Sequence, residues 1–329
     1  MRRPKVFVTQ PIAESALDRL REVADVEVNP DSSRVLAKDK LIDGVKRADI
    51  LLCLLHDTID REVLTANPDL KAVSSMNITQ DHIDLAAASE RGIPVANIPA
   101  IVTDATADIA FGLLLAVARN IALGDRLFRQ GVYPGSQSNH FAGHAVTGKT
   151  LGLIGFGRIG QAVARRGSGF GMKIVYYDPC RLAAEDERGF SVVYRDFDDL
   201  LREADFVSLH PRLTPDTRQL MSDGQFSLMK ATAFVINTSR GPVIDEAALV
   251  RALKSGRIAG AGLDVYEHEP KVAPELVAMP NVVLTPHLGS AVLELREDMA
   301  HIVVDNTIAL IEGRPPVSCF NPQVLKKLF

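Results

Sequence analysis

The feature that most constrains the fold is a glycine-rich turn between a short apolar run and a segment with helical periodicity. The apolar run begins at Thr150, and Gly155, Gly157 and Gly160 fit the pattern G-x-G-x-x-G. In this pattern the first glycine makes a tight turn, the second lets a pyrophosphate approach the backbone, and the third lets the helix pack on the strand. The stretch therefore predicts strand, turn and helix, with a dinucleotide phosphate at the turn.

A second apolar strand supports this interpretation, because a glycine turn alone is also common in plain loops. The strand runs from Lys173 to Tyr177 and ends in Asp178, about 20 residues beyond the glycines. A carboxylate at this position accepts hydrogen bonds from the adenosine ribose and repels a 2′-phosphate, so we expect NAD rather than NADP. Taken alone, Asp178 would be interpreted as a turn residue at the strand end before Pro179, and only the glycines beside it favour the ribose contact. Arg181 leaves some use of NADP open.

Length and composition limit the class of protein. The chain has 329 residues, which exceeds one ordinary core and predicts two domains, and 47% hydrophobic with 24% charged residues is typical of soluble globular proteins. A net charge of −4 gives no reason to expect nucleic acid or a membrane surface as a partner. The longest apolar run, Ile109 to Ala118, is too short to span a bilayer. Three scattered cysteines predict no disulfide framework and no metal site, which fits a reducing cytoplasm.

The first hundred residues alternate apolar strands with helical segments, which is typical of βαβ units around a parallel sheet. We predict strands at 5–9, 48–54, 70–74 and 93–96. Ligands bind beyond the carboxyl ends of such strands. His56, Asn77, Ile78 and Thr79 follow strand ends and are therefore candidate walls of a substrate pocket.

The remaining chain predicts a second nucleotide-binding sheet. Thr103 and Asp104 are predicted to cap a long apolar helix through about Arg129, and residues 131–148 form a linker without periodicity. Further strands are predicted at 191–194, 206–210, 233–237, 258–264 and 282–285. A long amphipathic helix follows over residues 290–312, and the prolines after it predict an extended tail.

Three polar side chains follow separate strand ends of this second domain. They are Arg240, Glu269 and His287, and each taken singly has an ordinary explanation as a loop ion pair, a solvated turn acid or a capped loop histidine. Together they supply what hydride transfer to a 2-oxo acid requires. Arginine grips a planar carboxylate with two hydrogen bonds. Histidine passes a proton to the forming alkoxide, and a neighbouring glutamate orients its ring.

These residues, in this order and spacing, resemble the D-isomer-specific 2-hydroxyacid dehydrogenase family over essentially the whole chain. The resemblance is carried by the glycine motif and by residues 237–242, 262–270 and 285–291. It implies that Arg240 binds the substrate carboxylate and carbonyl, that His287 is the acid/base, and that Glu269 supports it. Glu267 is the less favoured partner.

The same resemblance implies an α/β fold with two doubly wound parallel-sheet domains. A Rossmann NAD-binding domain, residues 102–289, is inserted into a flavodoxin-like substrate domain, residues 1–101 and 290–329, and the helix from Thr103 helps to build a homodimer. Asp264 is expected opposite the nicotinamide amide. The expected cofactor contacts are Gly155, Gly157, Arg158, Ile159, Gly160, Asp178, His210, Thr238, Asp264 and Gly289. The expected substrate contacts are His56, Asn77, Ile78, Thr79 and Arg240.

Two segments depart from the family pattern. Where the family has G-V-G-x-D in the substrate loop, this chain reads from Asn77 to Asp81, with β-branched Thr79 in place of a glycine. Because Thr adopts a left-handed backbone poorly, the loop is either reshaped or has an ordinary conformation at Thr79. Arg212 stands where proline is usual, and we interpret it as a solvated loop arginine.

The sequence therefore predicts an NAD-dependent oxidoreductase that interconverts a small D-2-hydroxy acid and a 2-oxo acid, acting mainly as a reductase in the cytoplasm. Two alternatives stay open. One is a dehydrogenase of a small oxyanion such as phosphite or formate on the same scaffold. The other is an NAD-sensing interaction protein similar to the family's corepressors. A phosphoglycerate dehydrogenase with an added regulatory domain is disfavoured for a chain of this length.

Overall fold

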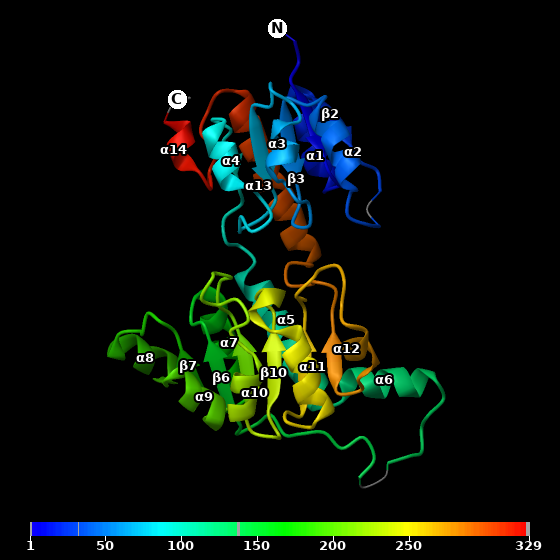
Figure 1. Ribbon diagram of the computed structural model, residues 1–329, viewed down its shortest axis with the longest axis vertical. Coiled ribbons are helices and arrows are strands. Elements are labelled where there is room, and N and C mark those ends of the chain that lie inside the picture. The colour runs from blue at the N-terminus through cyan, green and yellow to red at the C-terminus, as the bar shows by residue number, and fades with distance from the viewer. Residues whose placement is uncertain (1, 32, 137–138, 327–329) are drawn as a thin grey trace. The chain divides into compact units, whose positions relative to one another are not determined.

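The computed structural model describes residues 2–31, 33–136 and 139–326, which fall into two compact units. Unit 1 comprises residues 1–101 and 292–329, and unit 2 comprises residues 102–291 (Figure 1). Each unit is built on one parallel sheet, of five strands in unit 1 and seven in unit 2. The predicted fold class of two doubly wound parallel-sheet domains is confirmed.

Unit 1 alternates strands and helices along its first hundred residues. Its elements are β1 (Lys5–Val8), α1 (Glu14–Val23), β2 (Asp25–Val28), α2 (Lys38–Val45), β3 (Ile50–Cys53), α3 (Arg61–Thr65), β4 (Ala72–Ser75), α4 (Leu85–Glu90), β5 (Val95–Ala96), α13 (Leu293–Ile311) and α14 (Pro322–Leu325). The strand order is β2-β1-β3-β4-β5, which is the flavodoxin-like order. The central strands β3 and β4 are buried along their whole length, as expected where helices cover both faces of a parallel sheet.

The C-terminal helix belongs to the fold of unit 1. Helix α13 packs against α1 and against β4. The Asn306 amide nitrogen donates to the Asn97 carbonyl at 2.9 Å, and the Val95 N–H donates to Asn321 Oδ1 at 2.8 Å. These buried hydrogen bonds attach the last segment of the chain to the edge strand β5, so the two parts of unit 1 fold as one body.

Unit 2 contains the glycine turn. Its elements are α5 (Thr103–Ala118), α6 (Ile121–Arg129), β6 (Thr150–Ile154), α7 (Arg158–Gly169), β7 (Lys173–Tyr177), α8 (Ala184–Phe190), β8 (Val192–Tyr194), α9 (Phe197–Glu203), β9 (Phe206–Leu209), α10 (Asp223–Leu228), β10 (Phe234–Asn237), the 3₁₀ helix η1 (Gly241–Val243), α11 (Glu246–Lys254), β11 (Gly260–Leu263), α12 (Pro274–Ala278) and β12 (Val282–Leu284). The strand order β12-β11-β10-β9-β6-β7-β8 places β6 and β9 side by side where the order reverses, and this is the switch point at which such sheets bind ligands.

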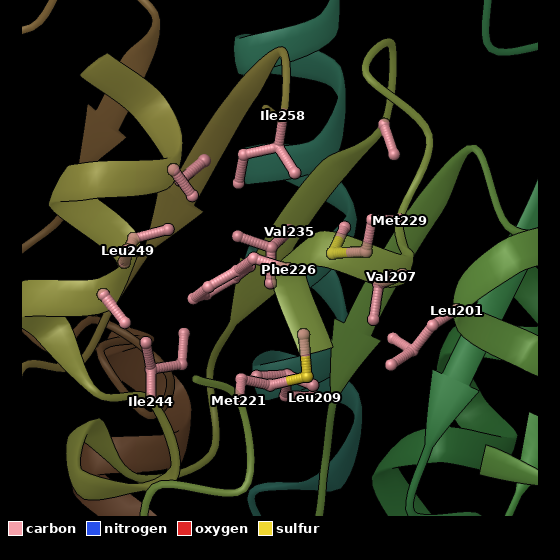
Figure 2. Packing of buried hydrophobic residues seen from close by; sticks show 14 of the residues in the cluster. Leu201, Val207, Leu209, Met221, Phe226, Met229, Val235, Ile244, Leu249 and Ile258 are labelled. Atoms are coloured by element: carbon pink, nitrogen blue, oxygen red, sulfur yellow. The ribbon is translucent and has the colours of Figure 1, made fainter. Parts of the chain in front are cut away.

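Two hydrophobic cores hold the sheet of unit 2 between its helices. One core contains side chains of α9, α10 and α11, and the other contains side chains of α5 and α7. Figure 2 shows the first core, with Phe226 of α10 beside Val235 of β10. Phe226 is 1% exposed, and loss of such a ring costs about 3–5 kcal/mol of folding free energy. The cores fix the strands β10, β11 and β12, after which Arg240, Glu269 and His287 follow.

Three local expectations were incomplete or wrong. Strand β2 was not predicted, because its edge position exposes charged Asp25 and leaves a weak apolar pattern. The helix predicted from Thr103 to about Arg129 is two helices, since Asn120 has a left-handed backbone with φ 55° and interrupts it. The tail is not wholly extended, because α14 begins at Pro322, and proline is tolerated in the first turn of a helix.

Among the described residues, no single helix is long and apolar enough to cross a membrane. The pair α5 and α6 meets that test only when its two helices, bent by 64°, are taken together.

Candidate active site

The glycine turn joins β6 to α7 and leaves room for a phosphate. Gly155 has φ 87°, and a Cβ on it would lie 2.7 Å from the carbonyl carbon of His210, so this position requires glycine. A Cβ on Gly160 would lie 2.3 Å from the Gly155 oxygen. At Gly157, the N-cap of α7, a Cβ would meet no described atom within 4 Å. Open space beside a helix N-terminus fits a pyrophosphate, whose charge the N–H groups there stabilise.

Asp178 is fixed directly beside this turn. Its Oδ2 accepts a hydrogen bond from the Phe156 N–H at 2.8 Å, and its Oδ1 accepts one from the Cys180 N–H at 2.9 Å. The Phe156 ring packs on Tyr176 with 4.4 Å between ring centroids, which holds the turn against β7. Each carboxylate oxygen keeps a second lone pair for a ribose hydroxyl.

The ends of β9 and β10 carry buried polar atoms close to the switch point. The His210 N–H donates to the Ile154 carbonyl at 2.7 Å, and His210 Nε2 lies 2.9 Å from Ser208 Oγ. Burial lowers the pKa of His210 to about 3, so its ring is neutral at physiological pH. Within the described part of the chain, His210 Nδ1 and Thr238 Oγ1 are buried without a hydrogen-bond partner. Buried polar groups are normally satisfied, so these two atoms fit a bound polar ligand such as NAD.

The other predicted cofactor residues lie in the same unit. Arg158 is exposed and Ile159 is half-buried in the first turn of α7, and Gly289 is buried after β12. Their contacts with NAD stay predictions.

His287 and Glu269 are brought together from loops after β12 and β11. His287 Nδ1 lies 3.0 Å from Glu269 Oε2, and the side chains are 18% and 20% exposed. A carboxylate only accepts hydrogen bonds, so Nδ1 carries the proton and donates it, which leaves Nε2 as the atom able to exchange a proton with a substrate. Glu269 Oε1 accepts a second hydrogen bond, from the Tyr266 N–H at 3.0 Å, which fixes the carboxylate's orientation.

Glu267 points to different partners. Its Oε1 accepts a hydrogen bond from Gln219 Nε2 at 3.0 Å, and its Oε2 accepts one from the Glu246 N–H at 3.1 Å. Of the two glutamates in this segment, Glu269 is therefore the one hydrogen-bonded to the His287 ring.

Asp264 organises the loop that carries the histidine. It is 1% exposed, and its carboxylate accepts hydrogen bonds from Thr285 Oγ1 at 2.6 Å, the Leu288 N–H at 2.7 Å and the Gly289 N–H at 2.9 Å. The His287 N–H donates to the Asp264 carbonyl at 3.0 Å. His287 itself has φ 55°, a strained conformation for a non-glycine residue, and these bonds hold it there. The nicotinamide contact expected of Asp264 stays a prediction.

Sequence reasoning missed one support of this loop, the side chain of Tyr266. The Tyr266 hydroxyl donates to the Thr285 carbonyl at 2.8 Å, which links the segment carrying Glu269 to the one carrying His287. Tyr266 is 8% exposed. The sequence signal for this support was a tyrosine between Leu263, where the strand ends, and Glu269.

Arg240 lies just beyond β10, and its loop touches the Glu269 segment. A Cβ on the next residue, Gly241, would lie 1.8 Å from the Tyr266 carbonyl oxygen, so only glycine allows the two loops to approach. Arg240 Nη1 donates to the Ser239 carbonyl at 2.8 Å. The three predicted catalytic residues thus follow the adjacent strands β10, β11 and β12 at one edge of the sheet.

The predicted substrate loop lies in unit 1. Asn77 is 7% exposed and, with its amide oxygen as acceptor, receives hydrogen bonds from the Leu55 N–H at 3.0 Å and His82 Nε2 at 3.1 Å. Thr79 is not among the residues with positive φ, so of the two alternatives the ordinary backbone conformation holds. His56 is exposed after β3, while Ile78 and Thr79 are half-buried.

Comparison with known proteins agrees with this geometry. Residues 111–289 match the family model of the D-isomer specific 2-hydroxyacid dehydrogenase NAD binding domain. The chain is 45% identical over 327 residues to a glyoxylate reductase of Thermococcus litoralis, covering 98% of each protein. The match includes the glycine turn and Asp178, and the predicted NAD cofactor is confirmed.

Solved structures are similar over almost the whole chain. A Thermus thermophilus protein superposes with a TM-score of 0.88 at 42% identity, over 96% of this chain and 99% of that one. An NADPH-dependent glyoxylate/hydroxypyruvate reductase of Sinorhizobium meliloti, solved with NADP and malonate, has a TM-score of 0.80 at 31% identity, over 97% of each chain.

Proposed function

The chain belongs to the D-isomer specific 2-hydroxyacid dehydrogenase family, and on that premise we propose that it reduces glyoxylate or another short 2-oxo acid with NADH. The observation that carries the proposal is the hydrogen bond between His287 Nδ1 and Glu269 Oε2, because a carboxylate at Nδ1 fixes the orientation of the ring and stabilises its protonated form. The relative from Thermococcus litoralis is a glyoxylate reductase, which makes glyoxylate the first substrate to test.

In the proposed mechanism each polar residue has one task. Arg240 binds the substrate carboxylate with its planar fork and orients the carbonyl. Bound NADH supplies the hydride that C2 of the substrate accepts. As negative charge develops on the carbonyl oxygen, His287 donates a proton to it from Nε2 and becomes neutral, and the product is a D-2-hydroxy acid. Glu269 stabilises the imidazolium before the transfer and keeps the ring in position.

Residues of unit 1 are proposed to set substrate preference. The loop from Asn77 to Thr79 stands where the family pattern has glycines, and Asn77 is anchored to Leu55 and His82 rather than exposed. Thr79 is half-buried and carries a side chain where the family pattern has glycine, and we propose that this side chain favours short 2-oxo acids. His56 is proposed as a further substrate contact from the end of β3.

The proposed function is tested with the purified full chain. NADH and NADPH oxidation is followed with glyoxylate, hydroxypyruvate and pyruvate, and reduction of NAD⁺ is followed with D-glycerate, phosphite and formate. We expect turnover of a 2-oxo acid with a strong preference for NADH. Turnover of phosphite or formate alone would assign the scaffold to oxyanion oxidation, and a protein that binds NADH without any turnover would support an interaction role.

We also propose a homodimer located in the cytoplasm. Helix α6 has an apolar side, yet none of its residues is buried, with Ile121 57% exposed and Phe128 62% exposed. Such a face favours contact with a second copy. Light scattering after gel filtration tests this state, and Phe128→Glu is expected to yield monomers if α6 is in the interface. The exposed free thiol of Cys180 fits a reducing compartment.

A further inference from the structure

Arg181, which follows the expected ribose-binding residue Asp178 in the chain, forms an ion pair with Glu187. Arg181 follows shortly after Asp178, and its Nε donates to Glu187 Oε1 at 2.8 Å while Nη2 donates to Glu187 Oε2 at 3.1 Å. Both carboxylate oxygens are engaged by the planar guanidinium, which is the two-pronged geometry that arginine also uses to bind phosphate. The edge of Arg181 formed by Nε and Nη2 is thus occupied by a residue of its own chain.

The glutamate is itself positioned by the fold. Glu187 lies in α8, its side chain is 13% exposed, and its Oε1 also accepts a hydrogen bond from the Tyr176 hydroxyl at 2.9 Å. The Tyr176 hydroxyl in turn accepts one from the Leu182 N–H at 2.9 Å. The hydrogen bond from Arg181 lowers the pKa of Glu187, so the carboxylate is charged over the working pH range. Glu187 is therefore a fixed acceptor rather than a mobile surface acid.

A second contact holds the arginine on its other side. The Arg181 guanidinium carbon lies 4.9 Å from the centroid of the Tyr194 ring, within the range of a cation–π interaction. The Arg181 side chain is 59% exposed, so solvent and ligands can reach it. If Arg181 were released from Glu187, its guanidinium would therefore still contact the Tyr194 ring and would be accessible to a ligand.

The arrangement has a clear consequence for the adenosine end of the cofactor. A 2′-phosphate would need a cation to offset repulsion by Asp178. Arg181 is the cation that follows Asp178 in the chain, but Glu187 neutralises it and occupies the edge formed by its Nε and Nη2 atoms. Asp178, Arg181 and Glu187 together carry one net negative charge, which disfavours a phosphate more than Asp178 beside a free arginine would.

We propose that Glu187 is a specificity-determining residue for the cofactor, because it holds Arg181 away from a 2′-phosphate and so excludes NADPH. The proposal rests on the proposed function only in taking NADH as the cofactor, and it makes no use of the 2-oxo acid. Glu187 does not need to touch NADH. It acts by positioning Arg181, and its removal should change binding of 2′-phosphorylated nucleotides alone.

The test measures dissociation constants of NADH, NADPH and 2′,5′-ADP by calorimetry, without any substrate. The variants are Glu187→Gln, Arg181→Ala and the double variant. Glutamine keeps an acceptor for the Tyr176 hydroxyl but removes the charge that holds Arg181. The matched control is Glu203→Gln, because Glu203 also pairs with an arginine of unit 2, with 2.6 Å between Arg195 Nε and Glu203 Oε2.

We expect Glu187→Gln to bind NADPH and 2′,5′-ADP about tenfold more tightly than the unmodified protein, with NADH affinity changed less than about twofold. The double variant should lose this gain, and Glu203→Gln should show none. An unchanged NADPH affinity in Glu187→Gln, or a gain that persists without Arg181, would overturn the proposal. If Glu187→Gln does not fold, Arg181→Ala is the test. A loss of NADPH affinity in that variant would mean that Arg181 already binds the 2′-phosphate in the unmodified protein, and this would overturn the proposal. Failure of 2-oxo acid turnover would leave these binding results intact.

Discussion

The Nδ1 atom of His287 lies 3.0 Å from Oε2 of Glu269, although the two residues come from loops after different strands. The Tyr266 N–H fixes the same carboxylate, and the Asp264 carbonyl accepts from the His287 N–H. The pair is therefore positioned before any ligand arrives. Pre-positioned acid groups are what proton transfer to a developing alkoxide requires.

Glu269→Gln and Glu267→Gln should differ in their effect on kcat/KM. In Glu269→Gln the ring keeps an acceptor but loses a negative charge that stabilises the imidazolium, so kcat/KM should fall roughly tenfold at neutral pH. Glu267→Gln is the matched control, because Glu267 bonds to Gln219 and Glu246 instead. The measurement is kcat/KM of both variants at neutral pH. Equal values in the two variants would contradict the assignment of Glu269.

Arg240→Lys should impair binding as well as catalysis. An ammonium keeps the charge but cannot make two parallel hydrogen bonds to a carboxylate. We expect KM for the 2-oxo acid to rise and kcat to fall, with NADH affinity and melting temperature unchanged. Steady-state kinetics and calorimetry check this outcome. A variant with a normal KM would show that the substrate carboxylate is bound elsewhere.

Thr79→Gly should change substrate ranking more than stability. Thr79 is half-buried with an ordinary backbone, so glycine removes a side chain without relieving strain. We expect longer 2-oxo acids to gain kcat/KM relative to glyoxylate, while the melting temperature falls only slightly. Ratios of kcat/KM across a series from glyoxylate to 2-oxobutyrate provide the measurement. An unchanged ranking would place selectivity outside this loop.

His210 should make stability depend on pH. Burial lowers its pKa from an ordinary 6.5 to about 3, so between these values the unfolded chain binds a proton that the folded chain does not. Its contribution to the free energy of unfolding is therefore lost progressively as pH falls from 6.5 toward 3. The melting temperature of His210→Gln should decline less over pH 7 to 4 than that of the unmodified protein. His140→Gln, at an exposed position, is the control and should follow the unmodified protein.

Much of the fold could be predicted because the decisive signals are local. The glycines at 155, 157 and 160 and the apolar strands define a doubly wound sheet, and parallel strands bring their carboxyl ends to one edge. That rule predicts Arg240, Glu269 and His287 at one edge of the sheet, and the structure has them after the adjacent strands β10, β11 and β12. Strand β2 escaped prediction because its exposed charges mask its pairing with β1.

The remaining details depend on how individual side chains and backbone segments pack in the folded protein. Nothing near Asn77 in the sequence indicates that it accepts from Leu55 and His82, and nothing near Arg181 shows which acid will hold it. The break at Asn120 is a single left-handed residue inside an otherwise continuous helical pattern. Tertiary packing decides such features, so they become visible only in the structure.

The most direct test of the central claim is the turnover number for glyoxylate reduction by NADH in His287→Ala. Loss of the general acid should lower kcat about 10²- to 10⁴-fold, with a modest change in KM. NADH affinity and melting temperature, measured on the same sample, should match those of the unmodified protein. A His287→Ala protein that folds, binds NADH and reduces glyoxylate at a near-normal rate would contradict the mechanism.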